Sequence, residues 1–320
     1  MRAAVPDRTC DNRIELIELP VPEIGPDEVL VEVRAAGMNN ADLLHQKGVY
    51  ASRAFARPDL PDIGGMEMAG TVVRTGAAVS DVAVGDAVVA LCARAYADYV
   101  AVDREMLLPA PEGLSWPRRG ALPMGLLTEF EALTLAGMRP GRRVLVTAAT
   151  SGVGLIGVQV AKALGADSVI AMTRSPDAVP LLRKLGADEV VLSGARPASV
   201  GTVDIVLDHV GAGFVDECVP WLHDHSCVVS IGRLGGRAAT IDLTALAGKR
   251  ARIIGTTWKT QSTGELRETV AAAREQLLPA VRNGAVVPVI AETVHFEDIS
   301  DGYARLARPR PPGKLVVVFD

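Results

Sequence analysis

The chain has 320 residues and a formal net charge of -5, and 49% of its residues are hydrophobic. This length and composition predict about two domains with proper cores, and without a basic stripe we expect no nucleic acid as the main partner. Four scattered cysteines without a C-x-x-C pair favour a reducing compartment and a cytoplasmic location. No apolar signal segment and no run of about 18 apolar residues is present, so we expect no membrane association.

The first 122 residues predict a β-rich region. Proline and glycine clusters separate short segments of alternating apolar and polar character. A short helix at 38–44 is expected to be capped by an asparagine. Strands are expected at 14–19, 29–34, 71–74, 87–91 and 96–102, and a helix-rich stretch follows at 116–135.

Residues 143–175 predict a strand, a glycine turn, a helix and a second strand. An apolar strand over 144–149 precedes Gly152-Val153-Gly154-Leu155-Ile156-Gly157, a complete G-x-G-x-x-G. In such a unit Gly152 permits the tight turn, Gly154 lets a pyrophosphate approach the main chain, and Gly157 lets the helix lie close to the strand. The helix N-terminus then holds the phosphates of a dinucleotide. The alternative is a glycine-rich turn that binds nothing.

The end of the second strand favours NADPH over NADH. An acidic residue at this point usually holds the ribose 2′-hydroxyl of NAD, whereas a basic residue suits the 2′-phosphate of NADP. The sequence here reads Met172-Thr173-Arg174-Ser175, without a carboxylate. Arg174 offers a planar donor fork between two hydroxyls, and an exposed loop arginine is the alternative interpretation.

The remaining residues continue the alternation of strands and helices. Six strands with short connections predict an α/β fold with a doubly wound parallel sheet. The β-rich start and a short C-terminal β segment flank it, so we expect a β-rich catalytic domain from 1–122 and 263–320 and a dinucleotide-binding domain from 123–262. Strands are expected at 144–149, 168–172, 189–192, 203–208, 227–231, 251–257 and 314–319, and helices at 177–185, 214–222, 265–282 and 299–308.

The order of motifs resembles the medium-chain dehydrogenase/reductase superfamily, and within it the zinc-independent quinone oxidoreductase group that includes zeta-crystallin. The resemblance covers essentially the whole chain and implies a Rossmann domain beside a GroES-like catalytic domain. The matching segments are 35–42, 48–50, 65–70, 127–130, 151–154, 173–175 and the closing Gly313-Lys314-Leu315-Val316.

The resemblance also locates a missing metal site. In zinc-dependent members the catalytic ligands are a Cys, a His and a second Cys or its equivalent, and the matching positions here are Asn39, Met66 and Met124. Zinc takes thiolate, imidazole or carboxylate ligands. We therefore expect no metal, and we expect Glu67 to be a local salt-bridge or hydrogen-bonding residue.

The resemblance implies a set of site residues. Asn39 and Tyr50 are expected to be catalytic, as neutral donors to a developing oxyanion, with Asp42 in support. The alternatives are a helix cap for Asn39 and an apolar wall for Tyr50. The five histidines show no carboxylate or cysteine partner pattern, and we assign them no chemistry. The expected cofactor-binding residues are Thr128, Ser151, Gly152, Val153, Gly154, Thr173, Arg174 and Ser175.

These features predict an enzyme that transfers hydride from NADPH to a small-molecule quinone or an enone-type activated double bond. An enoyl-thioester or biosynthetic enone reductase is an alternative, and an NADPH-binding structural or regulatory protein is an alternative of another class. The apolar strand at 251–258 is expected at a sheet edge. The resemblance implies that it pairs with the same strand of a second chain in a homodimer.

Overall fold

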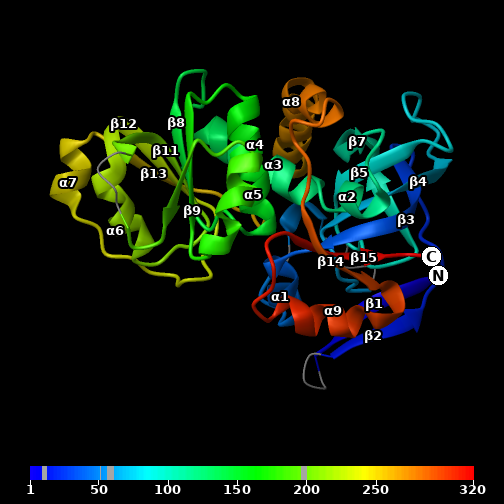
Figure 1. Ribbon diagram of the computed structural model, residues 1–320. Coiled ribbons are helices and arrows are strands. Elements are labelled where there is room, and N and C mark those ends of the chain that lie inside the picture. Colours follow the sequence, from blue (N-terminus) through cyan, green and yellow to red (C-terminus); the bar gives the residue numbers. More distant parts are fainter. Residues whose placement is uncertain (9–12, 51, 56–60, 196–199) are drawn as a thin grey trace. The chain divides into compact units, whose positions relative to one another are not determined.

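The computed structural model describes residues 1–8, 13–50, 52–55, 61–195 and 200–320. The chain forms two compact units (Figure 1), and the sequence contributes non-contiguous segments to both. Unit 1 contains residues 1–124, 258–274 and 288–320, and unit 2 contains residues 125–257 and 275–287. None of the helices in the described part of the chain combines the length and apolar character that a membrane crossing requires.

Unit 2 is built on the predicted parallel sheet. Its strand order is β10-β9-β8-β11-β12-β13, and every neighbouring pair is parallel. Figure 1 shows α4 and α5 on one face of this sheet and α6 on the other, which confirms the doubly wound fold. The strands are β8 (Arg143–Val146), β9 (Ser168–Thr173), β10 (Glu189–Leu192), β11 (Val203–Asp208), β12 (Leu222–Ser230) and β13 (Arg252–Gly255).

Apolar residues explain why the central strands β8, β9 and β11 are mostly buried. In β9 all six residues are buried, and Leu145, Ile170 and Val206 share one core cluster with Trp221. The helices of this unit are α3 (Pro123–Leu135), α4 (Gly152–Ala163), α5 (Val179–Lys184), α6 (Phe214–Cys218), α7 (Leu243–Gly248) and the end of α8 (Thr263–Arg282).

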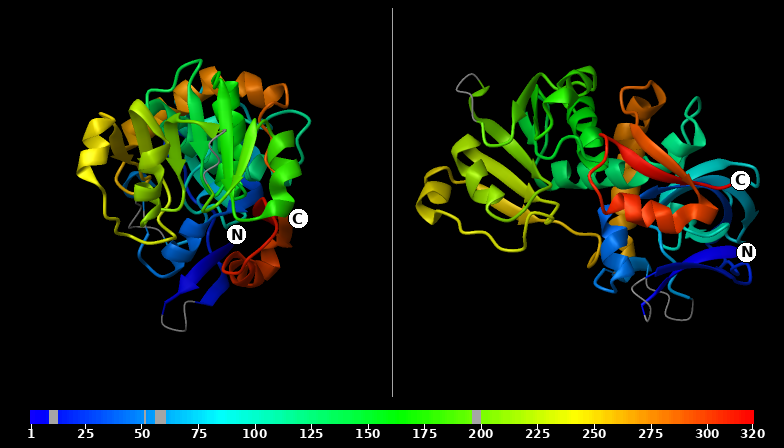
Figure 2. Two further views of the ribbon diagram at one scale, coloured as in Figure 1. Left: turned by 60° about the vertical axis from the view of Figure 1, so that its left-hand side comes forward. Right: turned by 60° about the horizontal axis from the view of Figure 1, so that its bottom comes forward.

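Unit 1 carries the GroES-like fold. Its larger sheet has the order β14-β15-β3-β4-β5-β7, and β6 also pairs with β3. A separate pair, β1 (Arg2–Asp7) and β2 (Arg13–Glu18), lies beside α9 (Ile299–Leu306) in Figure 2, where the Ser300 hydroxyl donates to the Ile14 carbonyl oxygen at 2.8 Å. The other elements are β3 (Glu28–Met38), α1 (Asn40–Gln46), β4 (Glu67–Thr75), β5 (Ala87–Leu91), β6 (Tyr99–Asp103), β7 (Leu107–Pro109), α2 (Trp116–Gly120), β14 (Ile290–His295) and β15 (Lys314–Val318).

The division of the chain differs from the sequence-based one mainly in residues 275–287, and residues 123–124 and 258–262 belong to unit 1. We expected residues 275–287 in the β-rich domain, but they belong to unit 2. The side chain of Gln159, on α4, explains the difference, because it accepts from the Val287 amide at 2.9 Å and donates to the Val287 carbonyl oxygen at 3.1 Å. The main-chain groups that follow α8 are therefore satisfied inside unit 2.

Two elements end before their predicted bounds, and a third lies where it was expected. The strand expected over 144–149 ends at Val146, because the chain turns at Ala148 with a φ of 42°. The helix expected over 214–222 stops at Cys218 and continues as a 3-10 turn over Val219–Trp221, which contains Pro220. Strand β13 lies at one end of the sheet order, so its predicted edge position is confirmed.

Candidate functional site

The predicted phosphate turn connects β8 to α4 in unit 2. Ser151 is the N-cap residue of α4, and its hydroxyl accepts from the Gly154 amide at 3.0 Å. The left-handed residue of the turn is Ala148, whereas Gly152 is the first residue of the helix. Our assignment of the tight turn to Gly152 is therefore wrong. The first turn of α4 still presents the main-chain amides and positive dipole end that bind an anion.

The two later glycines of the motif are needed for close contacts. A Cβ at Gly154 would lie 2.7 Å from the Ala148 carbonyl oxygen, so the helix could not start this close to the turn. A Cβ at Gly157 would lie 2.7 Å from the carboxyl carbon of Glu129, on α3. The neighbour that requires a glycine at 157 is thus a carboxyl group rather than the predicted strand.

The end of β9 carries the other expected cofactor residues. Thr173 is buried, and its hydroxyl accepts from the Ser175 amide at 3.0 Å, which fixes the bend after the strand. Arg174, between them, is exposed. Val153 is half-buried in the first turn of α4, and Thr128 is buried on α3. All eight expected cofactor residues belong to unit 2.

His209 has a carboxylate partner that the sequence did not reveal. It follows β11, and its Nε2 lies 2.6 Å from Oε1 of the buried Glu129. His45 in the same way lies 2.8 Å from a carboxylate oxygen of Asp62. The sequence shows no partner pattern for either histidine, because each pair is brought together by the fold.

Asn39 caps α1 in unit 1, as one of the two alternatives predicted. Its backbone amide donates to the Asp42 Oδ2 at 2.7 Å, in a capping box. Asp42 is fully buried, and the Tyr96 hydroxyl donates to the same carboxylate oxygen at 2.9 Å. Burial raises the pKa of Asp42 to about 7 despite these two donors.

A buried cation lies beside Asn39. Strand β15 pairs with β3, and β3 pairs with β4, so the residues at the ends of these strands meet. The Lys314 ammonium at the start of β15 contacts both Oδ1 of Asn39 and Oε1 of Glu67. Glu67 is fully buried and Lys314 is 3% exposed. The expected role of Glu67 as a salt-bridge residue is confirmed, and Lys314 entered the sequence analysis only as part of a matching motif.

The amide group of Asn39 is engaged on both sides. Its Nδ2 donates to Glu67 Oε1 at 2.9 Å and faces the Gly37 carbonyl oxygen at 3.3 Å, while its Oδ1 accepts from Lys314. The second Glu67 oxygen accepts from the Met124 amide at 2.8 Å. The polar groups around Asn39 therefore form one satisfied network, which fixes the orientation of this side chain.

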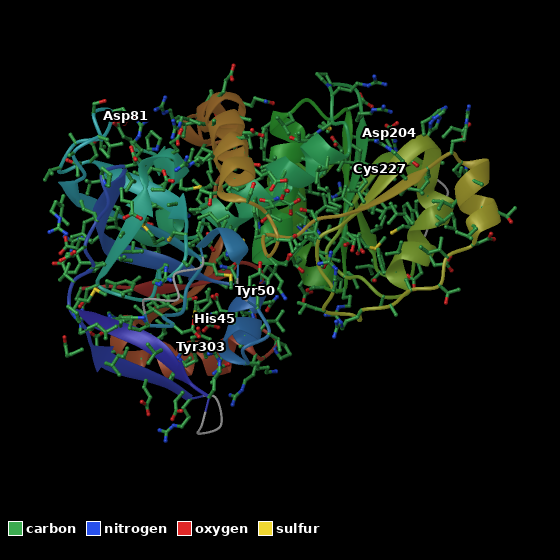
Figure 3. The ribbon with its side chains drawn as sticks, turned by 180° about the vertical axis from the view of Figure 1, so that it is seen from behind. His45, Tyr50, Asp81, Asp204, Cys227 and Tyr303 are labelled. Carbon is green, nitrogen blue, oxygen red and sulfur yellow. The ribbon has the colours of Figure 1, made fainter. Side chains whose placement is uncertain are left out.

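Tyr50 lies near a second lysine in unit 1. The Lys259 ammonium donates to the Val49 carbonyl oxygen at 2.9 Å and lies 5.6 Å from the Tyr50 ring centroid. The Ser52 hydroxyl donates to the Trp258 carbonyl oxygen at 2.8 Å. Figure 3 shows Tyr50 and His45 on the segment that contains α1. The chain after α1 thus contacts residues 258 and 259, and residues 51 and 56–60 lie outside the described residues.

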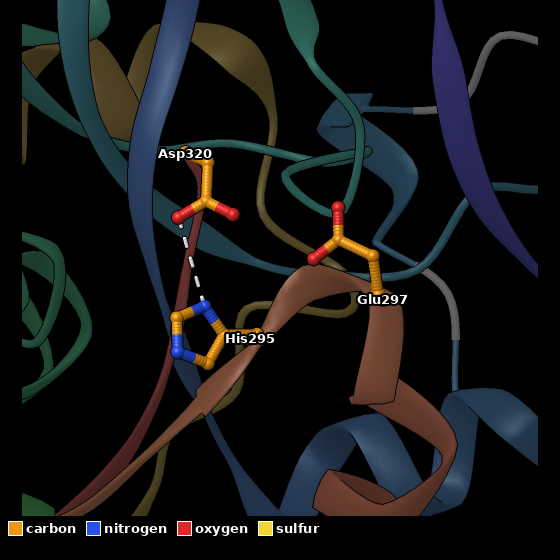
Figure 4. Close-up of side chains that lie close together, drawn as sticks. All are labelled: His295, Glu297 and Asp320. Atoms are coloured by element: carbon orange, nitrogen blue, oxygen red, sulfur yellow. Dashed lines mark ion pairs between the residues drawn. The ribbon is translucent and has the colours of Figure 1, made fainter.

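An exposed acidic group with one histidine lies elsewhere in unit 1. Figure 4 shows His295, Glu297 and Asp320, whose ligand atoms lie within 4.8 Å of one another. The His295 Nδ1 is 3.7 Å from Asp320, and Glu297 pairs with Arg2. Because Glu297 pairs with Arg2 and His295 pairs with Asp320, surface ion pairs explain why these side chains lie close together.

Two protein-family models match the chain. The model described as an alcohol dehydrogenase GroES-like domain matches residues 25–112, and the one described as a zinc-binding dehydrogenase matches residues 152–275. The positions of Asn39 and Met66 lie inside the first match, and Met124 lies outside both.

Three known proteins illustrate the similarity. The solved quinone oxidoreductase of Thermus thermophilus, studied also as its complex with NADPH, has a TM-score of 0.83 and 33% identity, over 99% of this chain and 100% of that one. The acryloyl-coenzyme A reductase of Sulfurisphaera tokodaii is 29% identical over 95% of this chain and 96% of its own length. The spectinabilin polyketide synthase system protein NorB of Streptomyces orinoci is 31% identical over 95% of this chain, which spans only 14% of that relative.

Proposed function

Because the chain belongs to the medium-chain dehydrogenase/reductase superfamily of oxidoreductases, in its quinone oxidoreductase group, we propose that it reduces a quinone or an enone-type double bond with NADPH and without zinc. The observation that carries this proposal is the buried contact of Lys314 with Asn39 and Glu67. It supports a site in which an ion-pair network of Lys314, Glu67 and Asn39 stands at a position that matches a metal ligand in zinc-dependent members.

The residues of unit 2 fit a dinucleotide. The capped start of α4 offers main-chain amides to a pyrophosphate, and Gly154 keeps the turn compact. The exposed guanidinium of Arg174, held between Thr173 and Ser175, suits a 2′-phosphate. The complex named for the Thermus thermophilus relative supports the same cofactor. When bound, NADPH supplies the hydride.

The residues at the matching metal positions do not fit zinc. Asn39, Met66 and Met124 offer no thiolate, imidazole or carboxylate. Glu67, the carboxylate next in the chain to Met66, already accepts from Lys314 and from the Met124 amide. A second cation beside Lys314 would meet charge repulsion in a buried place.

The acceptor is proposed to be activated by neutral donors. Hydride addition to an enone or quinone moves negative charge to an oxygen, and a preorganised hydroxyl stabilises that charge. Tyr50 is our candidate for this donor, and the nearby Lys259 ammonium supports a polar role over that of an apolar wall. Both amide hydrogens of Asn39 face protein oxygens, so Asn39 is proposed to act through its network with Asp42 and Lys314 in support. No covalent intermediate is required.

A thioester acceptor is the second candidate. The similarity to an acryloyl-coenzyme A reductase over 96% of its length favours it, because acryloyl-coenzyme A is itself an activated double bond. A protein that binds NADPH without important turnover is the candidate of another class.

A panel of quinones, enones and enoyl thioesters tests the proposal. We expect NADPH oxidation with at least one member, and deuterium from C4 of NADPH on carbon in an enone product. Elemental analysis should find no stoichiometric zinc, and chelators should not lower the rate. Alcohol oxidation without enone or quinone reduction, or one zinc per chain, would contradict the proposal. NADPH fluorescence changes without turnover would favour a binding protein.

We also propose a homodimer through β13. This strand is at the sheet edge, and its residues are exposed or half-buried, a state that proteins cover or pair. Pairing with a second copy would extend the sheet across a two-fold axis. Light scattering should give the dimer mass, and a monomer mass at every concentration would refute this.

A further inference from the structure

The contact between Glu129 and His209 determines where the imidazole hydrogens lie. The Thr147 carbonyl oxygen is 2.9 Å from His209 Nδ1, and a carbonyl can only accept, so Nδ1 carries a hydrogen. The other ring nitrogen faces Glu129 Oε1 at 2.6 Å, which requires one proton between them. Whether this proton rests on the imidazole or on the carboxyl, the pair is neutral overall.

Loss of the shared proton is strongly disfavoured. It would set the lone pair of a neutral imidazole against a carboxylate that is 0% exposed. Burial alone would lower the pKa of His209, but the charge and hydrogen bond of Glu129 outweigh burial and raise that pKa. Within the described residues, the other charge that acts on His209 is that of Asp208, which also raises its pKa, while the neighbouring parts of β8 and α4 present the uncharged Thr147 and Gly157.

The pair lies where a doubly wound sheet binds its ligand. Thr147 and His209 directly follow β8 and β11, the two neighbouring strands at which the strand order reverses. Ligands of such sheets bind at the carboxyl ends of the strands at this point. The His209 amide also donates to the Thr147 hydroxyl at 2.9 Å, so the two strand ends are joined twice.

The same pair supports the glycine turn. The Glu129 carboxyl lies directly against Gly157, leaving no room for a Cβ. Its Oε2 is buried and has no hydrogen-bond partner within the described residues. A buried carboxylate oxygen without a donor costs free energy, which points to a functional reason for retaining this group.

We propose that Glu129 and His209 are positioning residues for the cofactor, which hold one shared proton and thereby keep the charge and the shape of the phosphate-binding turn constant with pH. This inference rests on the proposed cofactor function. A purely structural role would require only that the two side chains fill their space.

The first test compares Glu129→Gln with the double variant Glu129→Gln and His209→Gln in the full chain, measuring the NADPH dissociation constant relative to the wild type at each pH. In Glu129→Gln the imidazole loses its partner and titrates, at a pKa that burial lowers. We therefore expect the relative dissociation constant to rise roughly threefold to tenfold as pH increases through that lowered pKa, as one buried charge acting on phosphates allows. In the double variant neither the carboxyl nor the imidazole remains to titrate, and the ratio should stay constant. A constant ratio in Glu129→Gln would overturn the inference.

A second test needs no pH change. Gly157→Ala should weaken NADPH binding roughly tenfold by displacing the Glu129 carboxyl, but less than about twofold in a Glu129→Ala background, where the space is free. Equal losses in both backgrounds would show that Gly157 does not act through Glu129. Melting temperatures of the wild type, the two single variants and the double variant give the coupling between Gly157 and Glu129 even without cofactor binding. If the wild type binds no NADPH, the proposed function is contradicted. If the wild type binds NADPH but Gly157 and Glu129 show no coupling, only this inference is contradicted.

Discussion

Each unit buries one glutamate against a glycine and pairs it with a basic side chain, but the two pairs differ in what the basic group can do. In unit 1, Glu67 meets the Lys314 ammonium. In unit 2, Glu129 meets the imidazole of His209. The basic group of the first pair is an ammonium that contacts both Glu67 and Asn39, whereas the imidazole of the second pair shares one proton with its carboxyl partner. The first pair therefore provides a fixed cation, and the second provides a constant net charge.

The strongest way to break the first pair is Lys314→Met. The change leaves Glu67 as a buried charge without its cation, and removal of one partner of a buried ion pair costs roughly 3 to 5 kcal/mol of unfolding free energy. Urea unfolding at neutral pH measures the loss. The double variant Glu67→Gln with Lys314→Met is the matched control and should recover most of it. Equal losses in the single and double variants would contradict a role for the ion pair.

Asp42 should make the unfolding free energy of unit 1 depend on pH. Its pKa is about 7 in the folded chain, above the ordinary aspartate value of 3.8, so the folded state binds the proton more tightly. The unfolding free energy should therefore be highest at low pH and fall as pH rises through about 7, by roughly 2 to 3 kcal/mol between pH 5 and 8. Asp42→Asn should remove this part of the pH dependence. An unchanged slope in the variant would mean that other groups cause it.

Tyr50→Phe separates the two interpretations of Tyr50. If the hydroxyl stabilises an oxyanion, kcat should fall by about 10², as when one such donor is removed. If Tyr50 is only a wall, kcat should change little. Lys259→Met is the companion variant, because it removes the cation beside the ring without touching the hydroxyl. Turnover with the most active acceptor of the panel decides between them.

Arg174→Ala tests the proposed contact with the 2′-phosphate of NADPH, and its expected effect is the smallest of the four. The affinity for NADPH should fall by about tenfold to a hundredfold, as loss of a charge-assisted phosphate contact predicts, while that for NADH stays the same. Titration of cofactor fluorescence measures both. Equal affinity of the unchanged protein for the two cofactors would overturn the assignment of Arg174.

The sequence predicted those parts of the fold that depend on local patterns. The six parallel strands, the glycine-bearing helix and the asparagine cap of α1 all follow from periodicity and from residues within a few positions of one another. The turn at Ala148 was missed because alanine rarely adopts a positive φ, so its sequence carries no turn signal.

The buried pairs could not be predicted in this way. Glu67 and Lys314 are 247 residues apart, and Glu129 and His209 are 80 apart. Only the tertiary fold brings each pair together: Glu67 and Lys314 meet through neighbouring strands, whereas Glu129 lies on α3 and His209 follows β11. The candidate site was therefore predicted as a set of positions, whereas the hydrogen bonds that orient Asn39 depend on the tertiary structure.

The position of Lys314 in the chain has a consequence for biosynthesis. Strand β15 completes the sheet of unit 1 and brings the ammonium to Glu67, yet all of unit 2 is translated between these two residues. Unit 2 is complete once residue 287 has left the ribosome. At that moment Glu67 still lacks its cation, and β3 still lacks β15 as a neighbouring strand. The domain translated in the middle can therefore fold first, and the nascent N-terminal strands must avoid aggregation until Lys314 emerges.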